Sequence, residues 1–319
     1  MKTLEEMMAY IQDPKVWVNM SAEELVELAQ FPNYQVRMEV AKHPNTPDKV
    51  LVKFAKDRSY RVRTAVVTSG YRRNEVLAIF ANDNDYRVRQ AIAKENKYLA
   101  PEVLLKLAED SEVEVRRAVA KRGSLPKEVL LKLAEDSEKD IRCVVAWKDV
   151  LPKEVLLKLT EDSEEDVRYI VAVKSYPPVE VLENTANPGV KIRKVINENL
   201  PPVEVFLKLA EDPEVEVRRA VAKRREGKLL HEVFCKLAND ADTEIRHAIA
   251  DKHDVQLPVE VLSKLVEDPD VGIRKAMAFH AFLTPHMLER LVNDPVEEVR
   301  VIAARVRNLV NKGFLNIAQ

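Results

Sequence analysis

The side chains that could carry out chemistry are few and scattered along this sequence. His247 and Asp251 lie four residues apart, with His253 and Asp254 close behind, so two to four donors could hold a metal ion. This spacing matches no metal-binding motif, and such side chains also occur singly on solvated helix faces. We therefore predict no metal site.

The two cysteines, Cys143 and Cys235, are too few for a disulfide framework or a four-cysteine metal site. Cys143 follows Arg142, whose positive charge could lower the pKa of a thiol. No histidine lies nearby to act as a base, so an idle or buried thiol is the simpler interpretation. Cys235 stands at an apolar position of a helical pattern and is expected in the core. The glycine-rich, Walker, zinc-protease and serine-hydrolase motifs are absent. The sequence predicts no enzyme and no cofactor.

Composition narrows the class of protein further. Of the 319 residues 46% are hydrophobic and 33% are charged, and 51 Lys and Arg nearly balance 53 Asp and Glu. This balance argues against a globally basic nucleic-acid binder and against an acidic disordered chain. The sequence has no apolar run of about 18 residues and no apolar signal core near residue 1. We therefore expect a cytoplasmic protein.

A repeat organises the elements that would position any site. Val-Arg or Ile-Arg followed by small apolar residues returns eleven times, and successive arginines are 25 to 28 residues apart. Such a period is typical of a solenoid rather than of two globular domains. We predict one repeat domain over residues 1–319, with an N-terminal cap at 1–20, repeats at 21–306 and a C-terminal cap at 307–319.

Each repeat has the pattern of a helical hairpin. In residues 125–147, Val129, Leu130 and Leu133 form an apolar stripe at helical spacing. Asp136, Ser137 and Glu138 interrupt that helix, and a second, shorter helix of about two turns is expected after them. Two turns do not persist alone in water, so packing on neighbouring repeats must stabilise the second helix.

An aspartate stands six residues before most of the repeated arginines. We interpret the aspartates and arginines as a structural ladder, because a guanidinium can bind carboxylates within its repeat or in the next. The copies of Arg37 and Arg193 lack the aspartate and carry Phe31 and Asn187 instead. The nine pairs are Asp57 and Arg63, Asp83 and Arg89, Asp110 and Arg116, Asp136 and Arg142, Asp162 and Arg168, Asp212 and Arg218, Asp240 and Arg246, Asp268 and Arg274, and Asp294 and Arg300.

The pattern Pro-x-x-Val-Leu-x-x-Leu-Ala-x-Asp, followed by Val-Arg-x-x-Val-Ala, resembles the variant leucine-rich repeat. It is also similar to HEAT-type repeats, in which an Asp–Arg ladder occupies the same positions. The resemblance covers about residues 21–306 and implies an all-α fold, a right-handed α-solenoid (superhelix) of about eleven two-helix repeats. The founding variant leucine-rich repeat protein has an N-terminal cysteine cluster for an iron–sulfur centre. Residues 1–40 contain no cysteine here, so that cofactor is not carried over.

Charge is unevenly distributed within the repeat. Beyond the ladder arginines themselves, the six residues after each one hold 14 Lys and Arg but only four acids in total. The second helices are therefore expected to form a basic concave surface, and the first helices an acidic back. The residues that we expect to bind a partner there are Arg117, Lys121, Arg122, Lys148, Lys174, Lys194, Arg219, Lys223 and Arg224.

Several functions are compatible with such a surface. The favoured one is a non-enzymatic scaffold that binds an acidic protein or peptide. A nucleic-acid backbone is an alternative partner. By resemblance, some HEAT-like solenoids are alkylpurine DNA glycosylases, and Trp147 and Tyr169 beside Lys148 and Lys174 form the nearest similar group. No acid is expected beside that group on the same face. A purely structural spacer without a ligand is the remaining alternative. No small-molecule substrate or membrane contact is predicted.

Three tyrosines suggest a secondary patch. Tyr34, Tyr60 and Tyr86 each stand three residues before a ladder arginine, and Arg61 and Arg87 follow two of them. Packing between repeats would explain this series, but tyrosine and arginine are also the residues that interface hot spots favour.

Overall fold

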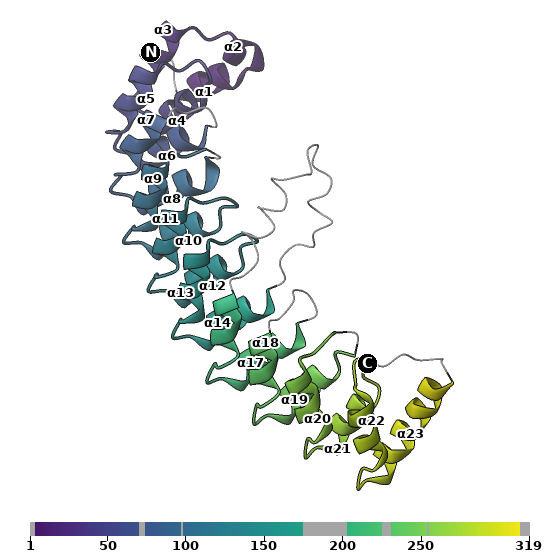
Figure 1. Cartoon of the computed structure of the whole chain (residues 1–319). Coiled ribbons are helices and arrows are strands. Elements are labelled where there is room, and N and C mark those ends of the chain that lie inside the picture. The colour runs from purple at the N-terminus through teal and green to yellow at the C-terminus, as the bar shows by residue number, and fades with distance from the viewer. Residues whose placement is uncertain are drawn as a thin grey trace, which may run out of the picture. The chain divides into compact units, whose positions relative to one another are not determined.

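The computed structural model describes residues 4–69, 74–96, 98–174, 203–224, 231–253 and 255–312. The chain divides into two compact units, residues 1–145 and 146–319. Both units consist of short helices packed side by side (Figure 1). One repeat domain with capped ends therefore remains a prediction.

The described residues form helices and no strands, as predicted. Each hairpin consists of a first helix and a second helix. In the first unit the helices are α1 (Leu4–Gln12), α2 (Pro14–Val18), α3 (Ala22–Leu28), α4 (Tyr34–Lys42), α5 (Asp48–Phe54), α6 (Tyr60–Thr68), α7 (Asn74–Phe80), α8 (Tyr86–Glu95), α9 (Pro101–Ala108), α10 (Val113–Ala120), α11 (Lys127–Leu133) and α12 (Lys139–Ala146), whose last residue already belongs to the second unit.

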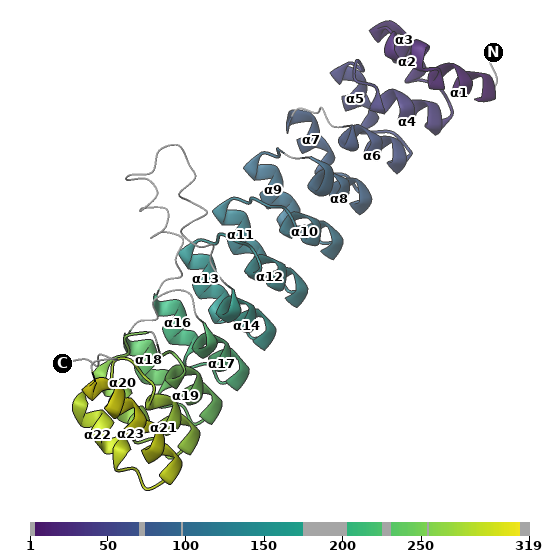
Figure 2. The same cartoon turned by 90° about the vertical axis from the view of Figure 1, so that its right-hand side faces the viewer.

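The second unit repeats the same design. Its helices are α13 (Lys153–Thr160), α14 (Glu165–Val173), α16 (Val203–Leu209), α17 (Val215–Lys223), α18 (His231–Leu237), α19 (Thr243–Ala250), α20 (Val259–Val266), α21 (Val271–Met277), α22 (Pro285–Val292) and α23 (Glu297–Asn311). Within each unit first helices pack on first helices and second helices on second helices, in two layers (Figure 2).

The core lies between the two layers. On α10 the buried residues are Val115, Ala118, Val119 and Ala120, and on α9 they include Leu107. Small side chains on the second helices allow close packing, while leucines and valines of the first helices fill the space between layers. We expected the second helix of each hairpin to be the shorter one, and this is wrong for most hairpins. For example, α14 has 9 residues and α13 has 8. Both remain too short to persist outside the stack.

Capping residues fix where the helices begin. Ser21 and Glu24 form a capping box at α3, and the Asp242 side chain accepts the N–H of Ile245 at α19. In the first unit, the rings of Trp17 and His43 meet edge to face, with their centroids 4.4 Å apart.

Candidate functional site: the exposed face of the second helices

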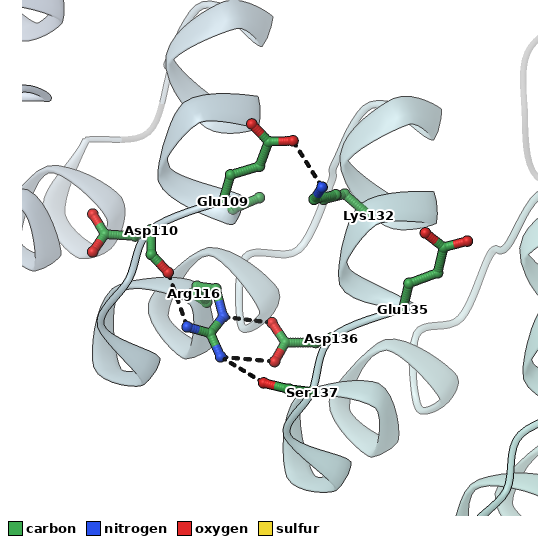
Figure 3. Close-up of a pocket in the computed structure, with 8 residues that line it drawn as sticks. Glu109, Asp110, Arg116, Lys132, Glu135, Asp136 and Ser137 are labelled. Atoms are coloured by element: carbon green, nitrogen blue, oxygen red, sulfur yellow. Dashed lines mark hydrogen bonds and ion pairs between the residues drawn. The ribbon is translucent and has the colours of Figure 1, made fainter.

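The ladder arginines bond in two directions and thereby orient the second helices. Arg116 donates from Nε and Nη2 to the Asp136 carboxylate of the next hairpin, at 2.7 and 2.9 Å (Figure 3). Its Nη1 donates to the backbone carbonyl of Asp110 in its own hairpin at 2.9 Å. Asp136 also accepts the backbone N–H of Glu138 at 2.9 Å. The side-chain pair therefore joins neighbouring hairpins, while the bond within a hairpin goes to the main chain.

The same pairing recurs through both units with N···O distances of 2.5–2.7 Å. The pairs are Arg37–Asp57, Arg63–Asp83, Arg89–Asp110 and Arg116–Asp136 in the first unit, and Arg168–Asp212, Arg218–Asp240, Arg246–Asp268 and Arg274–Asp294 in the second. Arg37 joins the ladder although its own hairpin has no aspartate, because the carboxylate that it binds belongs to the next hairpin.

One ladder step joins two residues that are 44 apart in sequence. Arg168 binds both carboxylate oxygens of Asp212, at 2.5 and 2.9 Å, across 44 residues of sequence. Its helix α14 packs on α17, and α13 packs on α16. The intervening copy, with Asn187 and Arg193, lies outside the described residues. The stack of the second unit therefore continues from Arg168 to the copy that follows that one.

The ladder bonds shift the pKa values of the carboxyl groups. Burial by itself would raise the pKa of Asp268, which is 1% exposed. The bonds from the Arg246 guanidinium and the Asp270 backbone N–H outweigh burial, so the pKa of Asp268 lies below its ordinary value. Asp110 and Asp294 have lowered pKa values for the same reasons.

The exposed face of the second helices consists of residues two before, one after and five after each ladder arginine. On α10 these are Glu114, Arg117 and the adjoining Lys121. The residues between them point into the core, as the helical period requires. We call this surface the second-helix face.

Most cations one residue after the ladder arginine are paired. Arg117 lies 3.9 Å from Asp140 of the next hairpin, and Lys275 lies 2.7 Å from Glu298. Arg219 binds the carboxylate of Asp242 at 3.1 and 2.7 Å. It also lies 3.1 Å from Glu216 and 3.4 Å from Glu244. These acids precede the ladder arginines, so a charge count that starts at the arginine misses them. The second-helix face carries alternating charges there.

Three lysines on this face differ from the paired cations. They stand five residues after their ladder arginines, at the carboxyl ends of second helices, and we call them the lysine row: Lys94, Lys121 and Lys223. All three are exposed, and within the described residues none forms an ion pair or hydrogen bond through its side chain. Lys94 and Lys121 belong to the first unit and Lys223 to the second.

The basic side chains six residues after the ladder arginines bind backbone carbonyls of a neighbouring hairpin. We had expected them on the partner-binding surface. Arg122 donates from Nη1 to the Ala93 carbonyl of the preceding second helix at 2.8 Å. Arg224 donates to the carbonyls of Ala172 and Lys174 at 2.8 and 2.6 Å. Lys252 donates to the Arg224 carbonyl at 2.6 Å. These side chains, which we call the capping row, satisfy carbonyls at the end of the neighbouring helix.

Burial accompanies this position. Burial lowers the pKa of Arg122 and of Lys148, which are half-buried. Lys174 is 6% exposed, and burial, with the Lys148 charge beside it, lowers its pKa to about 8 against the opposing effect of Asp149. Lys194 lies outside the described residues. Of the nine predicted binding residues, Lys121 and Lys223 present unpaired charge to solvent, and Arg117 is partly exposed.

Aromatic side chains lie beside part of this face in the second unit. Trp147 is 58% exposed, and Tyr169 on α14 is 42% exposed. Because α14 packs directly on α17, the hairpin of Tyr169 is the neighbour of the hairpin that carries Lys223. In sequence a whole repeat separates them, so this proximity comes from the tertiary structure.

The tyrosine series forms a stack with the arginines that follow it. The Arg87 Cζ lies 3.6 Å from the centre of the Tyr60 ring. The Arg61 Cζ lies 5.8 Å from the Tyr34 ring and 5.9 Å from the Tyr60 ring, and its Nη1 donates to the Tyr34 hydroxyl at 3.4 Å. Tyr86 is 39% exposed. Packing between hairpins thus explains Tyr34 and Tyr60.

The remaining chemical candidates have structural surroundings. His247 Nδ1 lies 3.1 Å from Asp251, and no group of three His, Cys, Asp or Glu in the described residues could hold a metal ion. Cys143 and Cys235 are half-buried and form no disulfide with a described residue, and burial raises the pKa of the Cys235 thiol. A pocket of about 270 Å³ is lined by the ladder residues Asp110, Arg116 and Asp136 and by Lys132, which lies 2.9 Å from Glu109 (Figure 3). Arg116 pairs with Asp136, and the Asp110 carboxylate pairs with Arg89 of the preceding hairpin.

No helix in the described part of the chain is long and apolar enough to cross a membrane. No protein-family model and no curated protein matches the chain. Among solved structures the chain is similar to a leucine-rich repeat variant with a novel repetitive structural motif. The identity is 29%, with 70% of this chain and 87% of that chain covered and a TM-score of 0.30.

Two further solved structures are similar at lower identity. Importin beta is 12% identical, with 92% of this chain and 45% of that chain covered and a TM-score of 0.36. A designed armadillo repeat protein in complex with the peptide (KR)4 is 15% identical, with 96% and 99% covered and a TM-score of 0.16. By its own helices and ladder the chain is an all-α hairpin-repeat protein, and it is similar to the leucine-rich repeat variant.

Proposed function

We propose that this chain is a non-enzymatic binding scaffold whose second-helix face binds an acidic segment of a protein or peptide. The lysine row carries the proposal. Lys121 and Lys223 are exposed and unpaired, whereas Arg219 and Lys275 on the same face are held by acids. A partner carboxylate meets an available ammonium at the lysine row without first breaking an ion pair.

The mixture of charges favours a protein partner over a nucleic-acid backbone. A nucleic acid presents phosphates at regular intervals and needs a continuous cationic surface. Here Glu114, Asp140 and Glu244 lie between the cations and would repel phosphates. Within the second unit, a peptide can place an acidic residue at Lys223 and its apolar residues on Trp147 and Tyr169.

The experiment that tests this proposal compares two double charge reversals. Lys121→Glu with Lys223→Glu alters the lysine row. Lys49→Glu with Lys53→Glu makes the same change of charge on the first helix α5, where both lysines are also exposed. Binding of a labelled poly-glutamate peptide is measured at low and at physiological salt, with circular dichroism as the check on folding.

We expect the lysine-row variant to bind poly-glutamate at least about tenfold more weakly, because like charges now face each other. The α5 variant should retain its binding. Absence of binding by the unaltered protein at low salt, or an equal loss in both variants, would refute the proposal.

The alternatives are separated by two further ligands. Binding of a 20-base-pair duplex that falls steeply with salt, and that exceeds poly-glutamate binding, would indicate a nucleic-acid partner. Base release from an alkylated duplex, lost in Trp147→Ala and Tyr169→Ala, would indicate the glycosylase alternative. A chain that binds none of these polymers would fit the structural spacer.

A further inference from the structure

The stack of tyrosines and arginines in the first unit leaves its last ring uncovered. We propose that the space over Tyr86, between Glu112 and Glu114, binds the guanidinium of an arginine side chain from a partner protein or peptide. This site is separate from the lysine row and does not depend on the function proposed above.

The preceding step of the stack shows how an arginine is held there. Arg87 lies over the Tyr60 ring, with its Cζ 3.6 Å from the ring centre. Its Nε and Nη2 donate to the carboxylate of Asp85 at 2.9 and 2.7 Å. One guanidinium thus meets an aromatic face and a bidentate carboxylate at once, the two contacts for which its planar fork is suited.

The next helix repeats this arrangement without the arginine. Tyr86 stands in α8 where Tyr60 stands in α6, three residues before the ladder arginine. Glu112 takes the position of Asp85, four residues before the next ladder arginine, and Glu114 takes the position of Arg87. The tyrosine and a carboxylate are therefore present at the equivalent positions. The arginine that would cover the ring is replaced by Glu114.

Contacts between α8 and α10 support this equivalence. These helices pack as α6 and α8 do. The Gln90 side chain donates from Nε2 to the Glu114 backbone carbonyl at 3.4 Å. Gln90 lies one turn after Tyr86, so this bond places the start of α10 beside the face of α8 that carries the tyrosine.

The local charge selects a cation. Tyr86 is 39% exposed, and among the described residues no guanidinium lies over its ring. The charge of Arg87 acts on Tyr86 from the same helix, and that of Arg89 acts on Glu112. Glu112 and Glu114 are exposed, and their carboxylates form no hydrogen bond or ion pair with a described residue. An exposed aromatic face with two carboxylates on the next hairpin attracts a cation, and a planar guanidinium can stack on the ring and bind a carboxylate at the same time, whereas a lysine ammonium cannot.

The test uses the whole chain and a small probe. N-acetyl-arginine methylamide is titrated against the protein by NMR, with the neutral citrulline analogue as the comparison. We expect millimolar binding, with upfield ring-current shifts of the arginine side-chain protons, and binding of citrulline at least about fivefold weaker. Equal binding of the two probes would overturn the proposal.

Variants locate the site. Glu114→Arg places a tethered arginine at the position equivalent to Arg87, so it should cover Tyr86 and abolish probe binding while the chain stays folded. Glu112→Gln should weaken binding about threefold to fivefold. Glu128→Gln, on the exposed surface of α11, removes the same charge elsewhere and should leave binding unchanged. Full binding by Glu114→Arg, or an equal loss with Glu128→Gln, would show that the arginine binds at another place.

Discussion

At the scale of single residues, each ladder arginine holds its own hairpin and the next one together. Arg116 bridges the Asp136 carboxylate in the next hairpin and the Asp110 carbonyl in its own, and its side chain is 12% exposed. A guanidinium can satisfy both because its donors lie in one plane and point outward in a fork. A lysine in its place would keep the charge and lose one of the two connections.

Removing the carboxylate should therefore destabilise the chain. The Asp136 side chain is 2% exposed, so Asp136→Ala leaves the Arg116 charge buried without its partner. We expect a loss of about 3 kcal/mol in the free energy of unfolding, measured by urea denaturation. Lys132→Ala breaks the nearby pair with Glu109, whose members are about half exposed, and should cost less than about 1 kcal/mol. Similar losses in both variants would contradict this account of the ladder.

The ladder also makes stability depend on pH. The pKa of Asp268 is lowered in the folded chain, so just below pH 4 the unfolded chain binds more protons than the folded one. The stabilisation that this ion pair provides is therefore present above about pH 4. It is lost as the pH falls toward the pKa of Asp268 in the folded chain. We expect the urea midpoint to fall on acidification from about pH 5 to pH 2, with a smaller fall in Asp268→Asn. An unchanged slope in that variant would argue against the assignment.

At the scale of helices, the end of each second helix is completed by its neighbour. The last carbonyls of a helix have no intrahelical donor, and the capping row supplies donors from the next hairpin. Arg224 provides two such bonds to the end of α14. It also lies 4.8 Å over the Phe206 ring of α16. These contacts give the recurring basic residue a structural role, which differs from the partner binding expected from sequence.

Substitution of adjacent residues separates these roles. Arg224→Ala leaves two carbonyls without a donor, so we expect a loss of about 2 kcal/mol and faster hydrogen exchange in α14. Lys223→Ala, one residue before, removes an exposed and unpaired charge and should change stability by less than about 0.5 kcal/mol. If the two substitutions had the same effect on exchange in α14, the capping role would be wrong.

At the scale of the whole molecule, neighbours in a stack need not be neighbours in sequence. Within the second unit α14 packs on α17, and Arg168 occupies both oxygens of Asp212. The copy between them, which carries Asn187, lies outside the described residues. This step also makes the hairpins of Tyr169 and Lys223 neighbours.

A double-mutant cycle tests the long ladder step. Arg168→Met and Asp212→Ala should show a coupling energy of about 1–3 kcal/mol, because each removes the same interaction. Arg193→Met and Asp212→Ala should be additive, since the Asp212 carboxylate is already bound by Arg168. Coupling to Arg193 instead of Arg168 would mean that the ladder follows the sequence order.

The helical hairpin, its period and the ladder positions could all be predicted from the sequence alone. These depend on local spacing, and repetition made the pattern visible: an aspartate, then an arginine six residues later, with apolar residues at helical intervals. The sequence also predicted an all-α fold, and the described residues confirm it, since they form helices and no strands. The right-handed superhelix over the whole chain stays a prediction.

Which charged side chains remain unpaired depends on the packing of the hairpins and could not be predicted from the sequence. The sequence does not distinguish the environments of Arg219 and Arg224. In the structure Arg219 pairs with Asp242, whereas Arg224 donates to backbone carbonyls. Lys223, which precedes Arg224, is exposed and unpaired. The physical reason is that pairing depends on which side chains the next hairpin brings within hydrogen-bond distance. Packing of the hairpins determines which hairpin is the neighbour. For Arg168, the partner is Asp212, 44 residues away in sequence.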